Sequence, residues 1–211
     1  MGHKCFISYK KEDQEYRDYL FKLFEVTDVI NKSLDRVIDS ENADYIMQTI
    51  RKDYLKDSTV TVFLIGNHSS ENEGTDWQGR DNNYYIKKEL QSSLYNGAGN
   101  TRNGILGVAL PNMYDRIYQG SGTCYKCGNT HDYVQINDST VIKEFSENYY
   151  LEPHSGCAWS EEERYCVLVK WDDFIENSEE YINKAFDKRE TDLYDKVHVN
   201  IKRDGIRYRF F

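Results

Sequence analysis

The chain has 211 residues and carries 27 Lys and Arg against 36 Asp and Glu, which gives a net charge of −9. This acidic balance argues against binding to nucleic-acid backbones, and no apolar run approaches the roughly 20 residues of a membrane-spanning helix. Aromatic residues make up 14% of the chain and only two prolines occur, so the composition excludes disorder or a fibre and favours a folded core.

The first part of the sequence alternates short apolar runs with helical periodicity. A strand is expected at 4–9 (KCFISY), followed by an amphipathic helix at 12–25. The next stretch is ambiguous, with a short second strand expected near 36–38, and a helix at 43–55 follows polar capping residues. The run 59–65 (TVTVFLI) is apolar on both faces, which is typical of a central strand covered by helices on both sides.

The second part continues this alternation. A helix is expected at 83–95, strands at 104–110 and 165–170, and a last helix at 171–188. Residues 111–164 interrupt the alternation as an insertion between the fourth and fifth strands. Strand–helix alternation implies right-handed crossovers, so the predicted fold class is α/β, a doubly wound, flavodoxin-like parallel sheet of about five strands.

We expect one domain over 1–211, ending in a β-like tail at 197–211. In an open parallel sheet, ligands bind beyond the carboxyl ends of the strands. This rule selects 8–11 after the first strand, 66–69 after the third and 110–112 after the fourth. These loops lack the clustered aspartates of a phospho-receiver and the glycine spacing of a dinucleotide fingerprint or a P-loop.

The loop after the first strand matches a known family. Phe6–Asp13 (FISYKKED), followed by an amphipathic helix, resembles the opening F-I-S-Y-S-x-x-D of TIR domains. The strand end 62–66 (VFLIG), then Trp77, then 85–90 (YIKKEL) is similar to that family's strand, tryptophan and W-x-x-x-E helix. The resemblance therefore implies a TIR-like fold.

The spacing of the second motif departs from the family, because Trp77 lies farther from the glutamate. Either 78–84 is inserted, or Tyr84 or Tyr85 takes the place of the tryptophan. The nearest resemblance is to the TIR-like proteins of bacterial anti-phage defence, including the Thoeris system, and WDDF at 171–174 also resembles that group. The resemblance covers roughly 4–110 and 165–188.

Enzymatic TIR domains cleave the nicotinamide–ribose bond of NAD, and the family's catalytic glutamate corresponds to Glu89. Breaking an N-glycosidic bond builds positive charge on the ribose carbon, which a nearby carboxylate stabilises. Glu89 lies beside the apolar stripe of its predicted helix, at i+3 from Ile86. The alternative reading is an ordinary solvated helix glutamate.

Residues Ser8, Tyr9, Lys10 and Lys11 are expected to form the first wall of a substrate pocket. Tyr9 is suited to stacking on a ring, and Lys10 and Lys11 to contacting phosphate, with Arg80 as a further cation, because NAD is an anion and the protein is acidic. The alternative for the lysines is a solvated turn.

Trp77 is a further candidate binding residue. His68 follows the third strand, but a loop histidine is more often merely exposed, so it is left out of the predicted site.

The five cysteines are an odd number in a chain that begins without a signal-peptide pattern, which favours the cytoplasm and reduced or metal-bound thiols over disulfides. Cys5 and Cys166 fall in predicted strands and are expected to be small core residues.

The remaining three cysteines lie in the insertion. Cys124-x-x-Cys127 followed by glycine resembles a zinc knuckle, and His154-x-x-Cys157 would complete a four-ligand structural zinc site, with His131 as a substitute. The alternative is three ordinary thiols in a loop-rich segment. Four protein ligands leave no open position, which argues against a catalytic zinc.

The favoured hypothesis is an enzyme that consumes NAD, releases nicotinamide and makes an ADP-ribose-derived product, cyclic or conjugated. By resemblance to Thoeris proteins, this nucleotide signal would activate a separate effector protein. A second copy of the chain, in a homo-oligomer, is a further candidate partner. Two alternatives remain open. One is a non-catalytic TIR adaptor, which has no need to keep the glutamate, and the other is a transferase of related architecture acting on free nucleosides.

Overall fold

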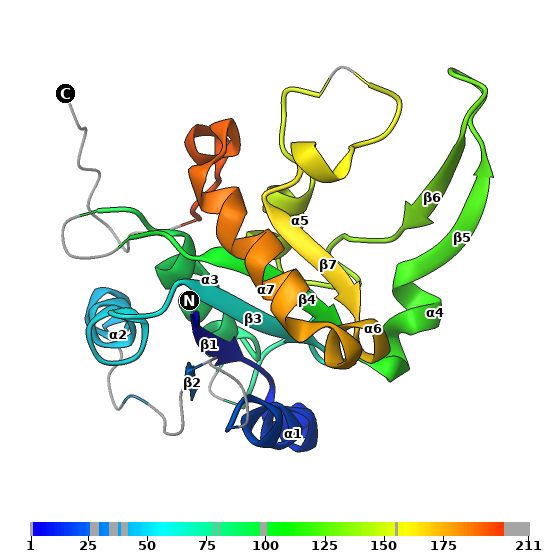
Figure 1. The fold of residues 1–211 in the computed structure, drawn as a ribbon. Helices are drawn as coiled ribbons and strands as arrows, with labels where there is room; N and C mark the ends of the chain where they lie inside the picture. The colour runs from blue at the N-terminus through cyan, green and yellow to red at the C-terminus, as the bar shows by residue number, and fades with distance from the viewer. Residues whose placement is uncertain are drawn as a thin grey trace.

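A five-stranded parallel sheet in the order β2-β1-β3-β4-β7 forms the centre of the molecule (Figure 1). The computed structural model describes residues 2–25, 30–33, 38, 42–77, 79, 81–97, 101–154 and 156–200. The strands of the sheet are β1 (Lys4–Ser8), β2 (Ile30–Ser33), β3 (Val60–Ile65), β4 (Gly104–Ala109) and β7 (Cys166–Lys170). A separate antiparallel hairpin consists of β5 (Tyr118–Thr123) and β6 (Thr130–Val134).

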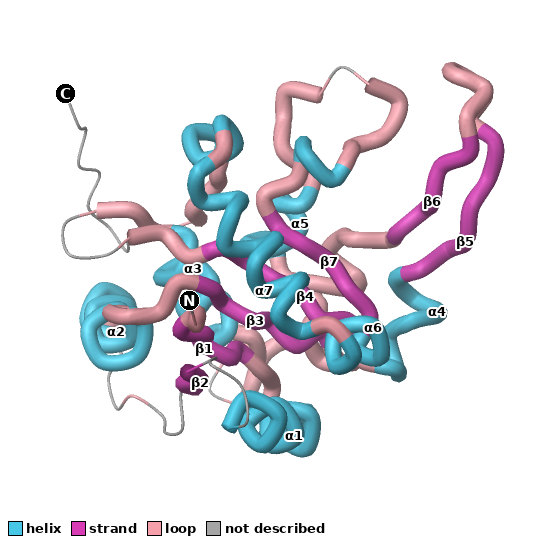
Figure 2. Tube along the Cα trace, viewed as in Figure 1, coloured by secondary structure: helices cyan, strands magenta, loops and turns pink. Residues whose placement is uncertain are grey.

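Helices cover both faces of the sheet (Figure 2). One face packs against α1 (Gln14–Glu25), α6 (Trp171–Glu176) and α7 (Ser178–Asp187). The other packs against α2 (Ala43–Thr49) with its π-helical continuation Ile50–Leu55, α3 (Tyr84–Leu94) and α5 (Lys143–Tyr149). A short helix, α4 (Tyr114–Ile117), leads into the hairpin.

Strand β3 shows why the central run of the sequence is apolar on both faces, with Thr61 as the strand's one polar residue. Val60, Val62 and Leu64 pack in the core on the α1 and α7 side. Phe63 and Ile65 pack in the core on the α3 and α5 side. Successive side chains of a strand point to opposite faces, so a strand with a helix layer on each side must be apolar at both sets of positions.

The predicted doubly wound, five-stranded parallel sheet is confirmed, and β1 and β3 are neighbours at its centre. The position of the second strand was wrong: it lies at Ile30–Ser33, not near 36–38. Ile38 belongs to no strand, and Arg36 and Val37 lie outside the described residues. The pattern failed here because edge strand β2 (INKS) has no apolar alternation to identify it.

The last predicted helix is two helices, because the backbone of Asn177 leaves the helical region at φ −136° and ψ 44°. Asparagine and serine side chains compete with helical hydrogen bonds, and Asn177-Ser178 supplies both. The predicted β-like tail has no strand over 197–200, where Val197 and Val199 instead pack on the core. Residues 201–211 lie outside the described part.

Part of the insertion belongs to the main core. Val141, Ile142, Phe145 and Tyr149 are buried with the side chains of α3 and β3. Gly107 on β4 makes room for the Phe145 ring, since a Cβ there would lie 2.4 Å from it. The insertion therefore supplies α5 as a covering helix, and only the hairpin and the loop before β7 extend away from the sheet (Figure 1). Within the described ranges, no helix is long and apolar enough to span a bilayer.

Replacing Gly104 with alanine tests how closely α7 approaches the sheet. A Cβ at this position would lie 1.9 Å from the backbone oxygen of Ala185, which cannot rotate away. We expect Gly104→Ala to lower the free energy of unfolding by roughly 1–3 kcal/mol in urea denaturation. Gly122→Ala on the hairpin is the control, because its new methyl group would meet only the Tyr133 ring, at 3.1 Å. Equal stability of the two variants would contradict this packing.

Candidate active site

A buried hydrogen bond joins the end of β1 to the middle of α3. Ser8 is the last residue of β1, and its hydroxyl donates to Oε2 of Glu89 at 2.6 Å. Ser8 is fully buried and Glu89 is 5% exposed. The structure thus brings together the two residues that the sequence placed at one edge of the sheet.

This pair lies where the fold is expected to bind ligands. The chain leaves β1 toward β2 on one side, whereas β3 pairs with β1 on the other side, so the connections diverge at the carboxyl end of β1. Ligands of doubly wound sheets bind in the crevice at such a switch point. Ser8 pairs in register with Phe63 of β3, so the Ser8–Glu89 contact sits directly at this position.

The surroundings of Glu89 favour its neutral form. Burial raises the pKa of the carboxyl from 4.5 to about 8, while the hydrogen bond from Ser8 acts in the opposite direction. A cation brought beside the carboxyl would favour the ionised form. The protonation state of Glu89 therefore depends on the charge of a ligand that binds beside it.

A second set of buried polar contacts fixes α3 on the sheet. The Ser93 hydroxyl donates to the backbone oxygen of Glu89 at 2.8 Å, and Thr61 of β3 donates to Ser93 at 2.7 Å. Asn103 donates to Thr61 at 3.1 Å. Sequence analysis missed these residues, although Thr61 is a polar residue within a buried strand and could have indicated them.

Asp13, the last residue of the FISYKKED motif, was also missed as a site residue. It is 4% exposed, and its Oδ2 has no hydrogen-bond partner among the described residues. Burial and the neighbouring Glu12 raise its pKa to about 6. A Cβ at Gly66 would lie 2.2 Å from Asp13 Oδ2, so glycine at the end of β3 allows this carboxyl to lie against the backbone.

The other predicted substrate-binding residues take no part in the Ser8–Glu89 hydrogen bond, and Tyr9 and Lys10 each have a partner of their own. Tyr9 packs on the α1 side, where Arg17 donates to its hydroxyl at 2.9 Å and stacks on its ring. Its ring is therefore engaged on the opposite face of the sheet from Glu89. Lys10 donates to the backbone oxygen of Asn82 at 2.8 Å, which ties the β1 loop to the segment before α3.

Lys11 is exposed at the start of a 3₁₀ turn that precedes α1. Trp77 is 90% exposed, so it does not pack with the buried pair, which leaves its predicted binding role without support from contacts. Arg80 lies outside the described residues.

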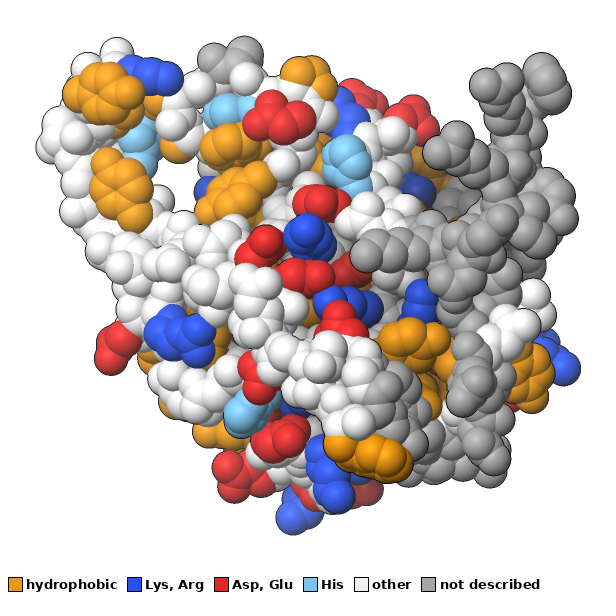
Figure 3. Space-filling view, turned by 180° about the vertical axis from the view of Figure 1, so that it is seen from behind, with side chains coloured by type: hydrophobic (Ala, Val, Ile, Leu, Met, Phe, Trp, Pro, Cys, Tyr) orange, Lys and Arg blue, Asp and Glu red, His pale blue; other side chains and the backbone are white. Residues whose placement is uncertain are grey.

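Apart from the buried Asp13, the loop acids near this edge are engaged in ion pairs or lie in solvent. Lys87 bridges Glu71, at 2.7 Å, and Asp81. Figure 3, which views the molecule from behind the orientation of Figure 1, shows acidic and basic side chains gathered in the middle of that face. Glu73 pairs with His68, and Glu12 is exposed. Among these carboxylates, Glu89 is distinguished by its burial and its serine partner.

The insertion brings together a separate group of side chains. The possible ligand atoms of Cys124, Cys127, His131 and Cys157 all lie within 4.8 Å of one another. The predicted set contained His154 in place of His131, and this is corrected. The His154 ring stacks on Trp159 with centroids 4.0 Å apart and lies beside Glu163, and it is not a member of the ligand cluster.

The family comparison agrees with the fold. The sequence model described as "Thoeris protein ThsB, TIR-like domain" matches residues 6–115, just over half of the chain. The chain belongs to this family. Membership identifies a TIR-domain protein related to Thoeris defence. The match includes both Ser8 and Glu89, and it ends before the hairpin and its cysteines.

The raised pKa of Glu89 predicts a pH-dependent effect of Glu89→Gln on stability. Because the folded-state pKa, about 8, exceeds the ordinary 4.5, the stabilising contribution of the carboxyl is complete below about pH 4.5 and is lost as pH rises through about 8. Glutamine stays neutral throughout. We therefore expect Glu89→Gln to gain stability relative to the wild type between pH 5 and pH 9, by on the order of a few kcal/mol in urea unfolding.

Glu179→Gln, at an exposed position of α7, serves as the control for this measurement. A stability difference between Glu89→Gln and the wild type that does not vary with pH would show that Glu89 titrates as an ordinary solvated glutamate.

Proposed function

We propose that this TIR-family chain cleaves NAD at the nicotinamide–ribose bond, with Glu89 as the catalytic carboxylate. The observation that carries the proposal is the buried Ser8–Glu89 hydrogen bond at the switch point of the sheet. Family membership supports the choice of NAD, because TIR enzymes act on this substrate.

The proposed reaction requires little beyond a well-placed negative charge. The C1′–N bond breaks, and its electron pair leaves with the nicotinamide nitrogen, which becomes neutral. Positive charge then develops on the ribose, and the Glu89 carboxylate stabilises it. A water molecule, a hydroxyl of the same nucleotide or a hydroxyl of a second molecule adds to C1′ and gives up its proton, for which Glu89 is the nearest base in the proposal. Attack within the same nucleotide gives a cyclic product, and attack by a second molecule gives a conjugate.

The buried setting of Glu89 suits a cationic substrate. In the free protein the carboxyl is largely protonated at neutral pH, because burial raises its pKa to about 8. The positively charged nicotinamide ring would favour ionisation when it binds beside the carboxyl. Substrate binding would thus create the carboxylate that the transition state needs.

Access to this carboxyl requires movement. Glu89 is 5% exposed, so a ribose can contact it only when the side chains that cover it move aside. Closure over the bound substrate would then exclude water and strengthen the interaction between the carboxylate and the developing cation. In the proposal, Lys10 and Lys11, which follow β1, would contact the diphosphate, and Lys10 would first be released from Asn82.

The product in this proposal is an ADP-ribose derivative, cyclic or conjugated, that acts as a signal for a separate effector protein. Support for this step comes from membership of the Thoeris family. Whether water or a nucleotide hydroxyl attacks C1′ decides between free ADP-ribose and a signal molecule, and mass spectrometry of the products separates the two.

Replacing Glu89 with glutamine is the direct test of catalysis. Glutamine keeps the size and hydrogen-bonding capacity of the side chain but cannot supply the negative charge. We expect nicotinamide release from NAD to fall by about 10²–10⁴-fold, with thermal melts confirming the fold. The assay uses conditions in which the wild type is active, including lysate from phage-infected cells if the resting protein is silent.

Glu73→Gln is the matched control, because it removes a carboxylate in the loop after β3 and should leave turnover near the wild-type level. If Glu89→Gln stayed near wild-type turnover while Glu73→Gln or Glu71→Gln lost it, the catalytic acid would be reassigned. If the wild type showed no turnover under any of these conditions, the non-catalytic adaptor would be the better description.

Ser8 is expected to act by positioning Glu89 and lowering its pKa. Without the hydroxyl, the carboxyl loses a hydrogen bond that favours its charged form. Ser8→Ala should therefore move the rising limb of the kcat/KM against pH profile upward by about one pH unit. Ser8→Thr keeps the hydroxyl and should restore most of the profile. An unshifted profile in Ser8→Ala would contradict this role.

A further inference from the structure

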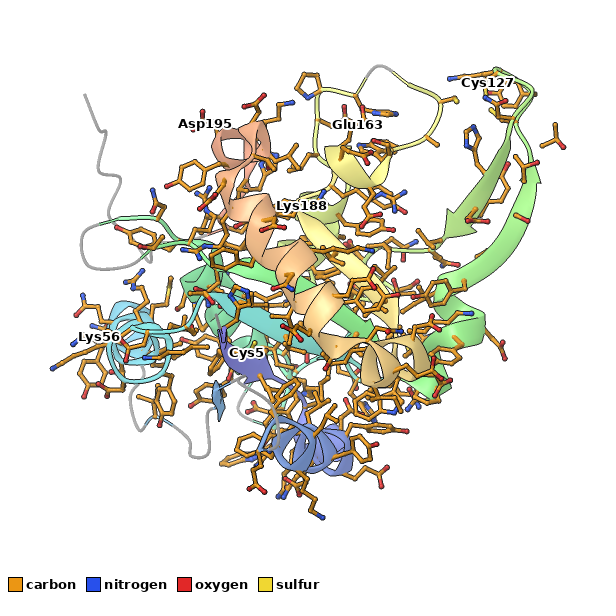
Figure 4. The ribbon with its side chains drawn as sticks, in the orientation of Figure 1. Cys5, Lys56, Cys127, Glu163, Lys188 and Asp195 are labelled. Atoms are coloured by element: carbon orange, nitrogen blue, oxygen red, sulfur yellow. The ribbon has the colours of Figure 1, made fainter. Side chains whose placement is uncertain are left out.

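Three thiols and one imidazole from two distant segments converge at the tip of the β5–β6 hairpin. Cys127 Sγ lies 3.1 Å from His131 Nε2, and Cys157 Sγ lies 3.2 Å from the same nitrogen. With Cys124, the four ligand atoms lie within 4.8 Å of one another. Figure 4 shows Cys127 at the hairpin tip, opposite the loop that precedes β7.

The turn that contains Cys124 and Cys127 directs their two thiols toward the same point. Gly128 N donates to Cys124 O at 2.8 Å, and Cys124 N donates to Asn129 O at 2.8 Å, which closes a tight turn. Gly128 has φ +75°, a conformation that residues with a Cβ rarely adopt. The turn thus places the Cys124 and Cys127 side chains on the same side.

The hairpin register adds the histidine. His131 of β6 pairs with Gly122 of β5, two residues before Cys124, so the strand pairing brings the imidazole beside the turn. Cys157 comes from the loop before β7, which is otherwise separate from the hairpin. Four ligands of this kind at these separations match a tetrahedral ion with metal–sulfur bonds near ~2.3 Å and metal–nitrogen bonds near ~2.1 Å.

We propose that Cys124, Cys127, His131 and Cys157 bind one zinc ion that fastens the hairpin tip to the loop before β7. The soft thiolate ligands favour zinc over magnesium or calcium, and four protein ligands leave no position for substrate. The site is therefore structural. It lies outside the residues matched by the family model, so it belongs to the insertion of this chain.

The surrounding chain explains what such an ion would stabilise. The strand residues of the hairpin are exposed or half-buried, and none of β5 or β6 is fully buried. The buried part of the insertion, around α5, instead packs on the sheet. Among the described residues, no buried apolar cluster joins the hairpin tip to the Cys157 loop, and the ion supplies the cross-link.

Elemental analysis of the full chain, purified without chelator in the presence of a reductant, tests the site. We expect one zinc per chain in the wild type. In competition with a chromophoric chelator, Cys157→Ser and His131→Ala should bind zinc at least roughly 10–100-fold more weakly. His154→Ala is the matched control and should keep wild-type affinity, because that histidine stacks on Trp159 instead.

The absorption spectrum of the cobalt-substituted wild type tests the ligand set without relying on the folding of any variant. Tetrahedral Co²⁺ with three thiolates should give visible d–d bands and a strong sulfur-to-metal charge-transfer band in the near ultraviolet. Removing the metal should raise hydrogen exchange over 118–134 and 156–160 and leave the sheet protected. Failure to bind zinc when it is added under reducing conditions, or loss of binding in His154→Ala with retention in His131→Ala, would overturn the proposal.

Discussion

The hydrogen bond between Ser8 and Glu89 is the contact on which the account of this protein depends. It exists because β1 pairs with β3 in parallel and α3 returns over their carboxyl ends. The Ser93–Thr61 contact holds α3 in register, and burial on all sides raises the pKa of Glu89 to about 8. A carboxyl in this state responds strongly to a nearby cation, which ordinary surface glutamates do not.

The insertion adds a helix to the layer that covers the sheet, and it contributes no residue to the Ser8–Glu89 site. Its helix α5 covers the sheet beside α3, and a hydrogen bond from Gln91 to Glu144 at 2.7 Å links the two helices. The proposed zinc cluster lies at the far end of the hairpin (Figure 1). Loss of metal should therefore change the hairpin and leave Glu89 as it is, so the two proposals can fail independently.

The sequence predicted the five-stranded sheet from its apolar runs, and it named Ser8 and Glu89 as site residues from the family motifs. It did not predict the hydrogen bond between them or the helix α5 of the insertion. It could not place β2, since the edge strand INKS lacks an apolar pattern. It chose His154 over His131 because spacing along the chain does not show that a hairpin register brings His131 to Cys127. Tyr9 was assigned to the substrate side, but the residue after a strand's end can turn to either face, and Arg17 holds it on the other.

The most direct test of the central claim is the titration of the Glu89 carboxyl itself. Carbon-13 NMR of protein labelled at the glutamate side-chain carboxyl follows each group, and the resonance missing from Glu89→Gln identifies Glu89. The account predicts a pKa near 8 in the free protein. It predicts a clear fall when a non-cleavable NAD analogue with a cationic ring binds. Titration in the range of an ordinary glutamate, unchanged by the analogue, would contradict it.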